Sequence, residues 1–142
     1  MNLRVTNYIN DFCNQFSEWM VQYIEKVLKK QDRFTLVLSG GSTPKKLYQL
    51  LASETYRNKI DWSRMHFFWG DERYVPFSDE RNNAKMAFDT LLDHVPVIKD
   101  QIHIIRTDSD SKAAASEDEK ILRRYFPDKN HTFDLVLLGL GD

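Results

Sequence analysis

Four short apolar segments, separated by stretches with helical periodicity, constrain the fold of this chain more than any other feature. The segments are rich in strand-forming residues and cover residues 34–39, 65–69, 102–107 and 133–141. A short continuous apolar run of this kind is typical of a strand that is buried on both faces. The alternation of such strands with helices predicts an α/β fold, a parallel sheet with helices on both of its faces.

Amphipathic helices are predicted before and between these strands. Apolar residues spaced three and four apart from Tyr8 to Leu28 predict a long first helix, with Thr6 or Asn7 as its cap. The later helices are expected from about residue 44, over 82–95 and over 111–126. In parallel sheets of this kind, ligands bind at the carboxyl ends of the strands, so the residues that follow each strand carry the functional information.

Composition excludes several classes of partner. The 142 residues carry a net charge of −1, which gives no general attraction to nucleic acid or to an anionic membrane. The apolar residues near the N-terminus are spaced rather than contiguous, so we expect neither a signal peptide nor a membrane span. The single cysteine, Cys13, cannot form an intrachain disulfide, which favours a cytoplasmic protein.

The sequence "SGGSTP" lies where the first strand hands over to a helix. Gly40 and Gly41 permit positive φ angles and leave their amides uncovered, while Ser42 or Thr43 could cap the helix and Pro44 suits its first turn. A glycine turn that opens onto a helix N-terminus is a good site for phosphate. The alternative is a tight turn with an N-cap and no ligand. The motif is neither a P-loop, a GxGxxG fingerprint nor a GxSxG nucleophile elbow.

Three adjacent charges, Asp71, Glu72 and Arg73, follow the second strand in "GDERYVP". The planar guanidinium of Arg73 could hold a phosphate or carboxylate, although a solvated turn with local ion pairs is the plain alternative. We expect no metal site, because no two of the histidines have the spacing of zinc ligands and Cys13 is remote from all of them. These histidines are His66, His94, His103 and His131. Gly139 and Gly141 indicate a close backbone approach at the end of the last strand.

Taken together, "LSGGSTP", "WGDERYVPFSDERNN" and "FDLVLLGLGD" resemble the motifs of the 6-phosphogluconolactonase family, in this order and spacing. The resemblance implies a modified Rossmann-like sheet and a hydrolysis of 6-phospho-D-glucono-1,5-lactone that needs no cofactor. It also implies that Gly40, Gly41, Ser42 and Thr43 receive the sugar phosphate. The further residues that it assigns to the site are Arg73 as a substrate-binding cation, Asn83 and, as an auxiliary candidate, Asp71.

The family's general base is a histidine in Asp-Gly-His, which would follow Asp142, so we assign no catalytic residue within the sequence. The apolar last strand has no helix after it, and we therefore expect residues 1–142 to form one sugar-phosphate-binding α/β domain whose C-terminal part is missing. An edge strand that ends a small domain is the alternative. Two other functions stay open, a glucosamine-6-phosphate deaminase of the same superfamily and a sugar-phosphate-binding module without catalysis.

Overall fold

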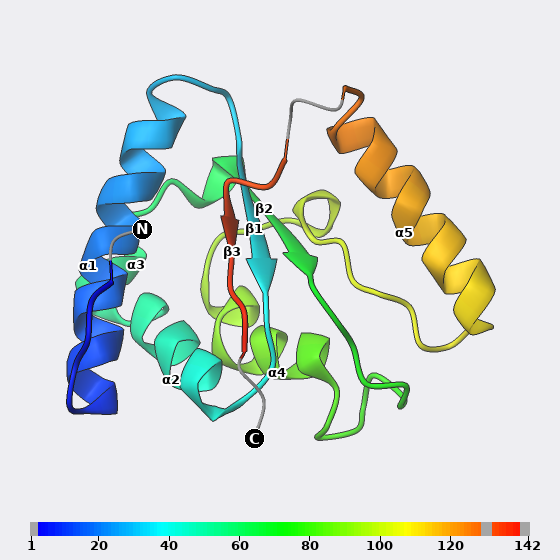
Figure 1. Ribbon diagram of the computed structural model, residues 1–142, viewed down its shortest axis with the longest axis horizontal. Helices are drawn as coiled ribbons and strands as arrows, with labels where there is room; N and C mark the ends of the chain where they lie inside the picture. Colours follow the sequence, from blue (N-terminus) through cyan, green and yellow to red (C-terminus); the bar gives the residue numbers. More distant parts are fainter. Residues whose placement is uncertain (1–2, 129–131, 140–142) are drawn as a thin grey trace.

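A three-stranded parallel sheet forms the centre of the protein in a computed structural model, which describes residues 3–128 and 132–139 (Figure 1). The strand order is β2-β1-β3, with β1 (Phe34–Leu38) between β2 (Met65–Trp69) and β3 (Leu135–Val136). The β1–β2 register pairs Phe34 with Met65 and Leu38 with Trp69, and the β1–β3 register pairs Leu36 with Leu135. All five residues of β1 are buried, as the apolar run predicts.

One helix precedes β1 and the others lie between the strands along the chain. The helices are α1 (Ile9–Leu28), α2 (Ser42–Leu51), α3 (Glu54–Arg57), α4 (Asn83–Thr90) and α5 (Ser111–Tyr125), with 3-10 turns at Trp62–Arg64, Leu92–His94 and Lys99–Gln101. The helix predicted over 82–95 is shorter, because Leu91 leaves the helical conformation and a 3-10 turn follows it. Among the described residues, no helix has both the length and the apolar character needed to cross a membrane.

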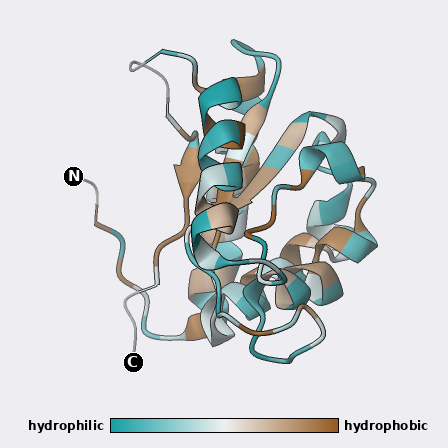
Figure 2. Cartoon of the chain, turned by 90° about the vertical axis from the view of Figure 1, so that its right-hand side faces the viewer, coloured by the Kyte–Doolittle hydropathy of each residue, from teal (hydrophilic) through white to brown (hydrophobic). Residues whose placement is uncertain are grey.

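Helices cover both faces of the sheet, as the sequence predicts. On one face, Leu36, Leu38 and Phe67 belong to a buried cluster with residues of α1 and α2. On the other face, the ring of Phe68 lies 5.1 Å from that of Tyr125 in α5. Figure 1 shows α1 and α2 on one side of the sheet and α5 on the opposite side. Figure 2 shows α5 in front of the apolar strands with hydrophilic residues on its outer surface.

The prediction of a strand over residues 102–107 is wrong, because this segment forms only one isolated bridge. Ile102 forms a single parallel bridge to Phe67, with the His103 N–H donating to the Phe67 carbonyl at 2.9 Å. Gln101 anchors the start of this segment, because its buried amide donates to the carbonyls of Trp62 and Met65 at 2.7 and 2.6 Å. Beyond the bridge no further ladder forms, and the chain runs as a loop to α5.

Two other boundaries differ from the prediction. Neither Thr6 nor Asn7 caps α1, because the N-cap is Tyr8, whose extended backbone starts the helix without a side-chain hydrogen bond. The strand predicted over 133–141 is reduced to two residues, and its residues 140 and 141 lie outside the described ranges. Pairing nevertheless continues on both sides, since Asp134 N donates to Thr35 O at 3.1 Å and Leu137 N to Val37 O at 3.0 Å.

Asp134 attaches β3 to the rest of the molecule. One carboxylate oxygen accepts hydrogen bonds from the backbone N–H and the hydroxyl of Thr35, at 2.7 and 2.8 Å. The other oxygen accepts from the side-chain amide of Gln31 at 2.9 Å, and the Asp134 carbonyl accepts from the hydroxyl of Tyr23 at 3.1 Å. One residue thus joins the last strand to β1, to α1 and to the turn between them.

Tyr125 attaches the end of α5 to the sheet. Its hydroxyl lies 2.8 Å from Nδ1 of His66 in β2 and 2.7 Å from Nε2 of His103. The guanidinium of Arg33 lies over the Tyr125 ring, 4.4 Å from its centre, and donates to the Tyr125 carbonyl at 2.7 Å.

Candidate active site

The loop that follows β1 leaves the sheet at a fixed point. The Ser39 N–H donates to the hydroxyl of Tyr48 at 2.9 Å, and that hydroxyl donates back to the Ser39 carbonyl at 2.8 Å. Tyr48 belongs to α2 and is completely buried, and this burial raises the pKa of its hydroxyl well above the ordinary value. The two bonds therefore tie the end of β1 to the helix that the loop leads into.

Helix α2 presents an open N-terminus. It begins at Ser42, earlier than the predicted start near Pro44, and its N-cap is Gly41 with a φ of 111°. That conformation favours glycine, as the sequence predicts for this position. Ser42 and Thr43 do not cap the helix, which corrects the prediction, because both follow the N-cap. Among the described residues, neither their amides nor their hydroxyls have a hydrogen-bond partner, so these donors stand free at the N-terminal, positive end of the helix.

Gly40 is held against the second motif. A Cβ atom on Gly40 would lie 2.0 Å from Oδ1 of Asn83, so any larger residue would have to displace this side chain. The Asn83 amide nitrogen also donates to the Asp71 carbonyl at 3.3 Å. The structure thus brings together three of the predicted site residues, Gly40, Asp71 and Asn83, through one side-chain amide.

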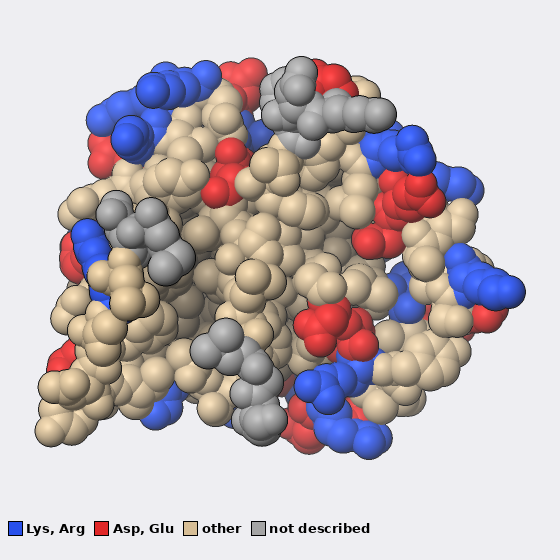
Figure 3. Space-filling model, in the orientation of Figure 1, with Lys and Arg blue, Asp and Glu red and all other residues tan. Residues whose placement is uncertain are grey.

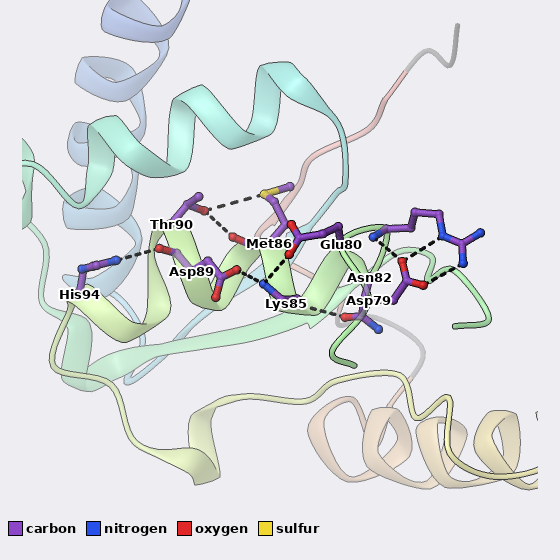
Figure 4. A network of polar contacts seen from close by, with 9 residues as sticks. Asp79, Glu80, Asn82, Lys85, Met86, Asp89, Thr90 and His94 are labelled. Atoms are coloured by element: carbon purple, nitrogen blue, oxygen red, sulfur yellow. Dashed lines mark hydrogen bonds and ion pairs between the residues drawn. The ribbon is translucent and has the colours of Figure 1, made fainter. Parts of the chain in front are cut away.

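Helix α4 begins on the other side of this contact, and its N-terminus is occupied. The side-chain oxygen of Asn82, the N-cap, accepts from the Lys85 N–H at 2.8 Å, as Figure 4 shows. The carboxylate of Glu72 accepts from the amides of Asn83 and Ala84 at 2.7 and 2.9 Å. Sequence reasoning missed this function of Glu72, because caps are recognised from neighbouring residues and Glu72 lies far upstream of the helix.

An open cleft of about 990 Å³ runs along the carboxyl ends of the strands. Its polar wall contains every predicted site residue, namely Gly40, Gly41, Ser42, Thr43, Asp71, Arg73 and Asn83. Its apolar wall includes Phe12, Leu47 and Leu138. Gly139 also lines it, and a Cβ atom there would lie 3.7 Å from the Ser39 hydroxyl.

A smaller cleft of about 440 Å³ adjoins the first and shares Gly41, Ser42, Arg73 and Asn83 with it. Lys45 and Arg81 also line the smaller cleft. Arg81 is paired with Asp79 at 2.8 Å, whereas the side chain of Arg73 is exposed and makes no ion pair with any described residue. Figure 3 shows basic and acidic side chains side by side over the loops that follow β2. Among the described residues, two cations at the clefts are therefore without an ion pair: Arg73, which lines both clefts, and Lys45, which lines the smaller one.

No histidine of the described ranges lines either cleft. His66 and His103 contact Tyr125 beneath α5, and Nε2 of His94 lies 2.8 Å from the Asp89 carbonyl. His131 and Gly141 lie outside the described residues. In the same ranges, His, Cys, Asp and Glu side chains form no group that could hold a metal ion. The described site can thus bind an anion through Arg73 and the amides of α2, and its described residues supply no histidine base.

Comparison with known proteins gives consistent matches over most of the chain. The sequence profile of the family described as glucosamine-6-phosphate isomerases/6-phosphogluconolactonase matches residues 9–142. A 6-phosphogluconolactonase from Nostoc is 40% identical over 123 residues, which cover 84% of this chain and 50% of the relative. One from Haemophilus influenzae is 39% identical over 104 residues, covering 73% of this chain and 44% of the relative.

The fold also matches a solved structure. The crystal structure of 6-phosphogluconolactonase from Thermotoga maritima has a TM-score of 0.82 and 31% identity, and the match covers 99% of this chain and 59% of that one. The chain spans about half the length of the curated relatives that it matches.

Proposed function

The chain belongs to the glucosamine-6-phosphate isomerase/6-phosphogluconolactonase family, and from this premise we propose that it provides the sugar-phosphate site of a 6-phosphogluconolactonase. The natural protein would hydrolyse 6-phospho-D-glucono-1,5-lactone to 6-phosphogluconate. Water gives up a proton to a general base as it adds to the lactone carbonyl, the tetrahedral oxyanion collapses, the bond to the ring oxygen breaks and that oxygen takes up a proton. This reaction needs no cofactor.

The observation that carries the proposal is the difference between the two helix N-termini at the cleft. The amides of α4 are already bonded to Glu72, whereas those of Ser42 and Thr43 in α2 have no recorded partner among the described residues. Of these two helix starts, that of α2 is the one that offers free amides to a phosphate, and the unpaired side chains of Arg73 and Lys45 line the clefts beside it. The sugar ring would then extend along the larger cleft toward the end of β3.

We propose that residues 1–142 belong to one sugar-phosphate-binding domain. The general base expected from the family resemblance is a histidine that would follow Asp142. A cytoplasmic compartment is part of the proposal, because Cys13 is the single cysteine of the sequence and is a free, buried thiol that forms no intrachain disulfide. The partner is a small sugar phosphate rather than nucleic acid or a membrane, because the net charge of −1 favours neither of the latter.

Arg73→Ala tests the proposal in the natural protein. Removing the guanidinium takes a cation away from the substrate phosphate, so kcat/KM should fall roughly 30-fold, which corresponds to a loss of about 2 kcal/mol in transition-state stabilisation. Arg106→Ala is the matched control, because Arg106 is also exposed but pairs with Asp108 and lines neither cleft. An unchanged kcat/KM in Arg73→Ala would contradict the assignment of Arg73.

A second candidate function is sugar-phosphate binding without catalysis. The observation that favours it is the absence of any described histidine from the cleft. Binding of 6-phosphogluconate by the natural protein with no lactone turnover would support it over the lactonase. A deaminase is a third candidate, and release of ammonia from glucosamine 6-phosphate would identify it. We favour the lactonase over the deaminase because, by resemblance, Arg73 stands where the deaminase branch carries tyrosine.

A further inference from the structure

The two helices that begin at the cleft, α2 and α4, differ in whether their N-terminal amides are hydrogen-bonded. Gly41 and Ser42 at the start of α2 and Asn82 and Asn83 at the start of α4 line the same 440 Å³ cleft. Both helix ends carry partial positive charge, so each would attract an anion if it were open. The fold leaves one of them open and closes the other.

Glu72 closes the start of α4. Its Oε1 accepts from the Asn83 amide at 2.7 Å and from the Arg73 amide at 2.7 Å, while Oε2 accepts from the Ala84 amide at 2.9 Å. Bonds from amides to an ionised carboxylate are about twice as strong as neutral ones. The carboxylate therefore fills the anion site of α4 and fixes the backbone of Arg73 in the same contact.

We propose that Glu72 is a positioning residue, an internal anion that reserves the N-terminus of α2 for the substrate phosphate and sets Arg73 and Asn83 beside it. The inference rests on the proposed function for the identity of the phosphate ligand. The positioning itself depends only on the contacts of Glu72.

The path from Glu72 to the phosphate loop runs through Asn83. Glu72 holds the Asn83 backbone, and the Asn83 side chain lies directly over Gly40, where a Cβ atom would be 2.0 Å from Oδ1. A shift at the start of α4 is therefore passed to Gly40 and Gly41.

Glu72→Gln tests the inference, because it removes the charge and puts an amide group opposite N–H donors. In the natural protein we expect KM to rise about tenfold while kcat stays within about threefold, since phosphate positioning is lost and the reacting groups are not touched. Glu119→Gln is the control, because this carboxylate lies on α5, pairs with Arg123 and lines neither cleft. An unchanged KM in Glu72→Gln would overturn the inference.

Amide NMR separates positioning from simple capping without reference to activity. Glu72→Gln should shift the signals of Gly40 and Gly41 as well as those of Arg73 and Ala84. Combining it with Asn83→Ala should abolish the response at Gly40. If the shifts remain confined to α4 and Arg73, Glu72 is a cap only and the inference fails.

Titration with inorganic phosphate distinguishes this failure from that of the proposed function. The unaltered protein should respond at Gly41, Ser42 and Thr43, and Glu72→Gln should gain a response at Asn83 and Ala84. If the amide signals of the unaltered protein do not change on adding phosphate and the protein also lacks lactonase activity, the proposed function is contradicted. The shifts of Gly40 and Gly41 in Glu72→Gln would still decide the positioning role.

Discussion

At the residue scale, two adjacent glycines of the phosphate loop are required for different reasons. Gly41 adopts a φ of 111°, which is the freedom that the sequence predicts for both. Gly40 is instead required by the Asn83 side chain, which leaves no room for a Cβ atom. The sequence was enough to predict both residues as site residues. It was not enough to predict why Gly40 must be small, because the reason is contact with Asn83, a residue of another motif that only the folded chain brings close.

Gly40→Ala should therefore impair both stability and activity. The added methyl group must displace Asn83, which we expect to lower the free energy of unfolding by about 1–3 kcal/mol and to reduce kcat/KM. Urea unfolding and steady-state kinetics measure the two effects. For the stability measurement Gly139→Ala is the matched control, because its Cβ atom would meet only an ordinary contact at 3.7 Å. Equal effects of the two substitutions would contradict this account of Gly40.

Ser42 and Thr43 offer a second prediction at this scale. Neither side chain caps α2, so Ser42→Ala and Thr43→Ala should each change the free energy of unfolding by less than about 0.5 kcal/mol. Both should weaken phosphate binding, measured by titration calorimetry, because each hydroxyl is a free donor at the cleft. Asn82→Ala provides the contrast, since it removes a real cap and should cost about 1 kcal/mol of stability. A comparable loss in Ser42→Ala would restore the capping interpretation.

At the scale of elements, continuous apolar runs located β1 and β2 and helical periodicity located α5, but the apolar run at residues 102–107 does not form a strand. The periodicity of α5 predicts that Tyr125 faces the protein, and it does, yet nothing in the sequence indicates that its hydroxyl joins His66 to His103. These two contacts hold α5 on its face of the sheet. The residues after Ile102 have strand-like composition but make a single bridge, because pairing depends on where the neighbouring chain leads rather than on propensity.

The attachment of α5 should weaken in acid. Burial lowers the pKa of His66, and the nearby charge of Arg33 lowers it further. Burial also lowers the pKa of His103. The charges of His66 and Arg124 lower this pKa further, whereas Asp100 raises it slightly. The unfolded chain therefore takes up these protons at a higher pH than the folded one. Stability is fully present above the unfolded histidine pKa of about 6.5 and falls as pH drops below it.

Urea unfolding at pH 7.5 and pH 5.5 measures this loss. The double variant His66→Gln, His103→Gln should show a smaller difference between the two pH values than the unaltered protein. His94→Gln is the control, since this histidine bonds to the end of α4 and lies away from α5. A pH dependence that is identical in the double variant would show that other groups cause the decline.

At the scale of the whole molecule, distant parts of the chain meet at β1. Its two neighbours in the sheet are β2, from the middle of the sequence, and β3, from near residue 135. Asp134, next to β3, accepts hydrogen bonds from both Thr35 and Gln31. The parallel architecture and the family could be inferred from the sequence, through the strand pattern and the three motifs. The strand order and the anchoring function of Asp134 could not, because neither leaves a local pattern in the sequence.

Asp134→Ala tests this anchor. It leaves the buried amide of Thr35 without its carboxylate partner, and we expect a loss of about 1–3 kcal/mol in the free energy of unfolding. Hydrogen exchange should also become faster at Leu137, whose amide bonds to β1. Asp108→Ala is the control, because this exposed carboxylate pairs only with exposed Arg106 and should change stability by less than about 0.5 kcal/mol. Similar losses in both variants would contradict an anchoring role.

The central position of β1 has a consequence for synthesis on the ribosome. Leu36 acquires its partner Leu135 only after almost one hundred further residues have been added, which takes roughly 5–20 s at ordinary rates of translation. Throughout that interval one edge of β1, whose five residues are all buried in the folded protein, is open in the nascent chain, and such an edge is prone to pair with other chains. The nascent protein should accordingly be a client for chaperones until β3 emerges.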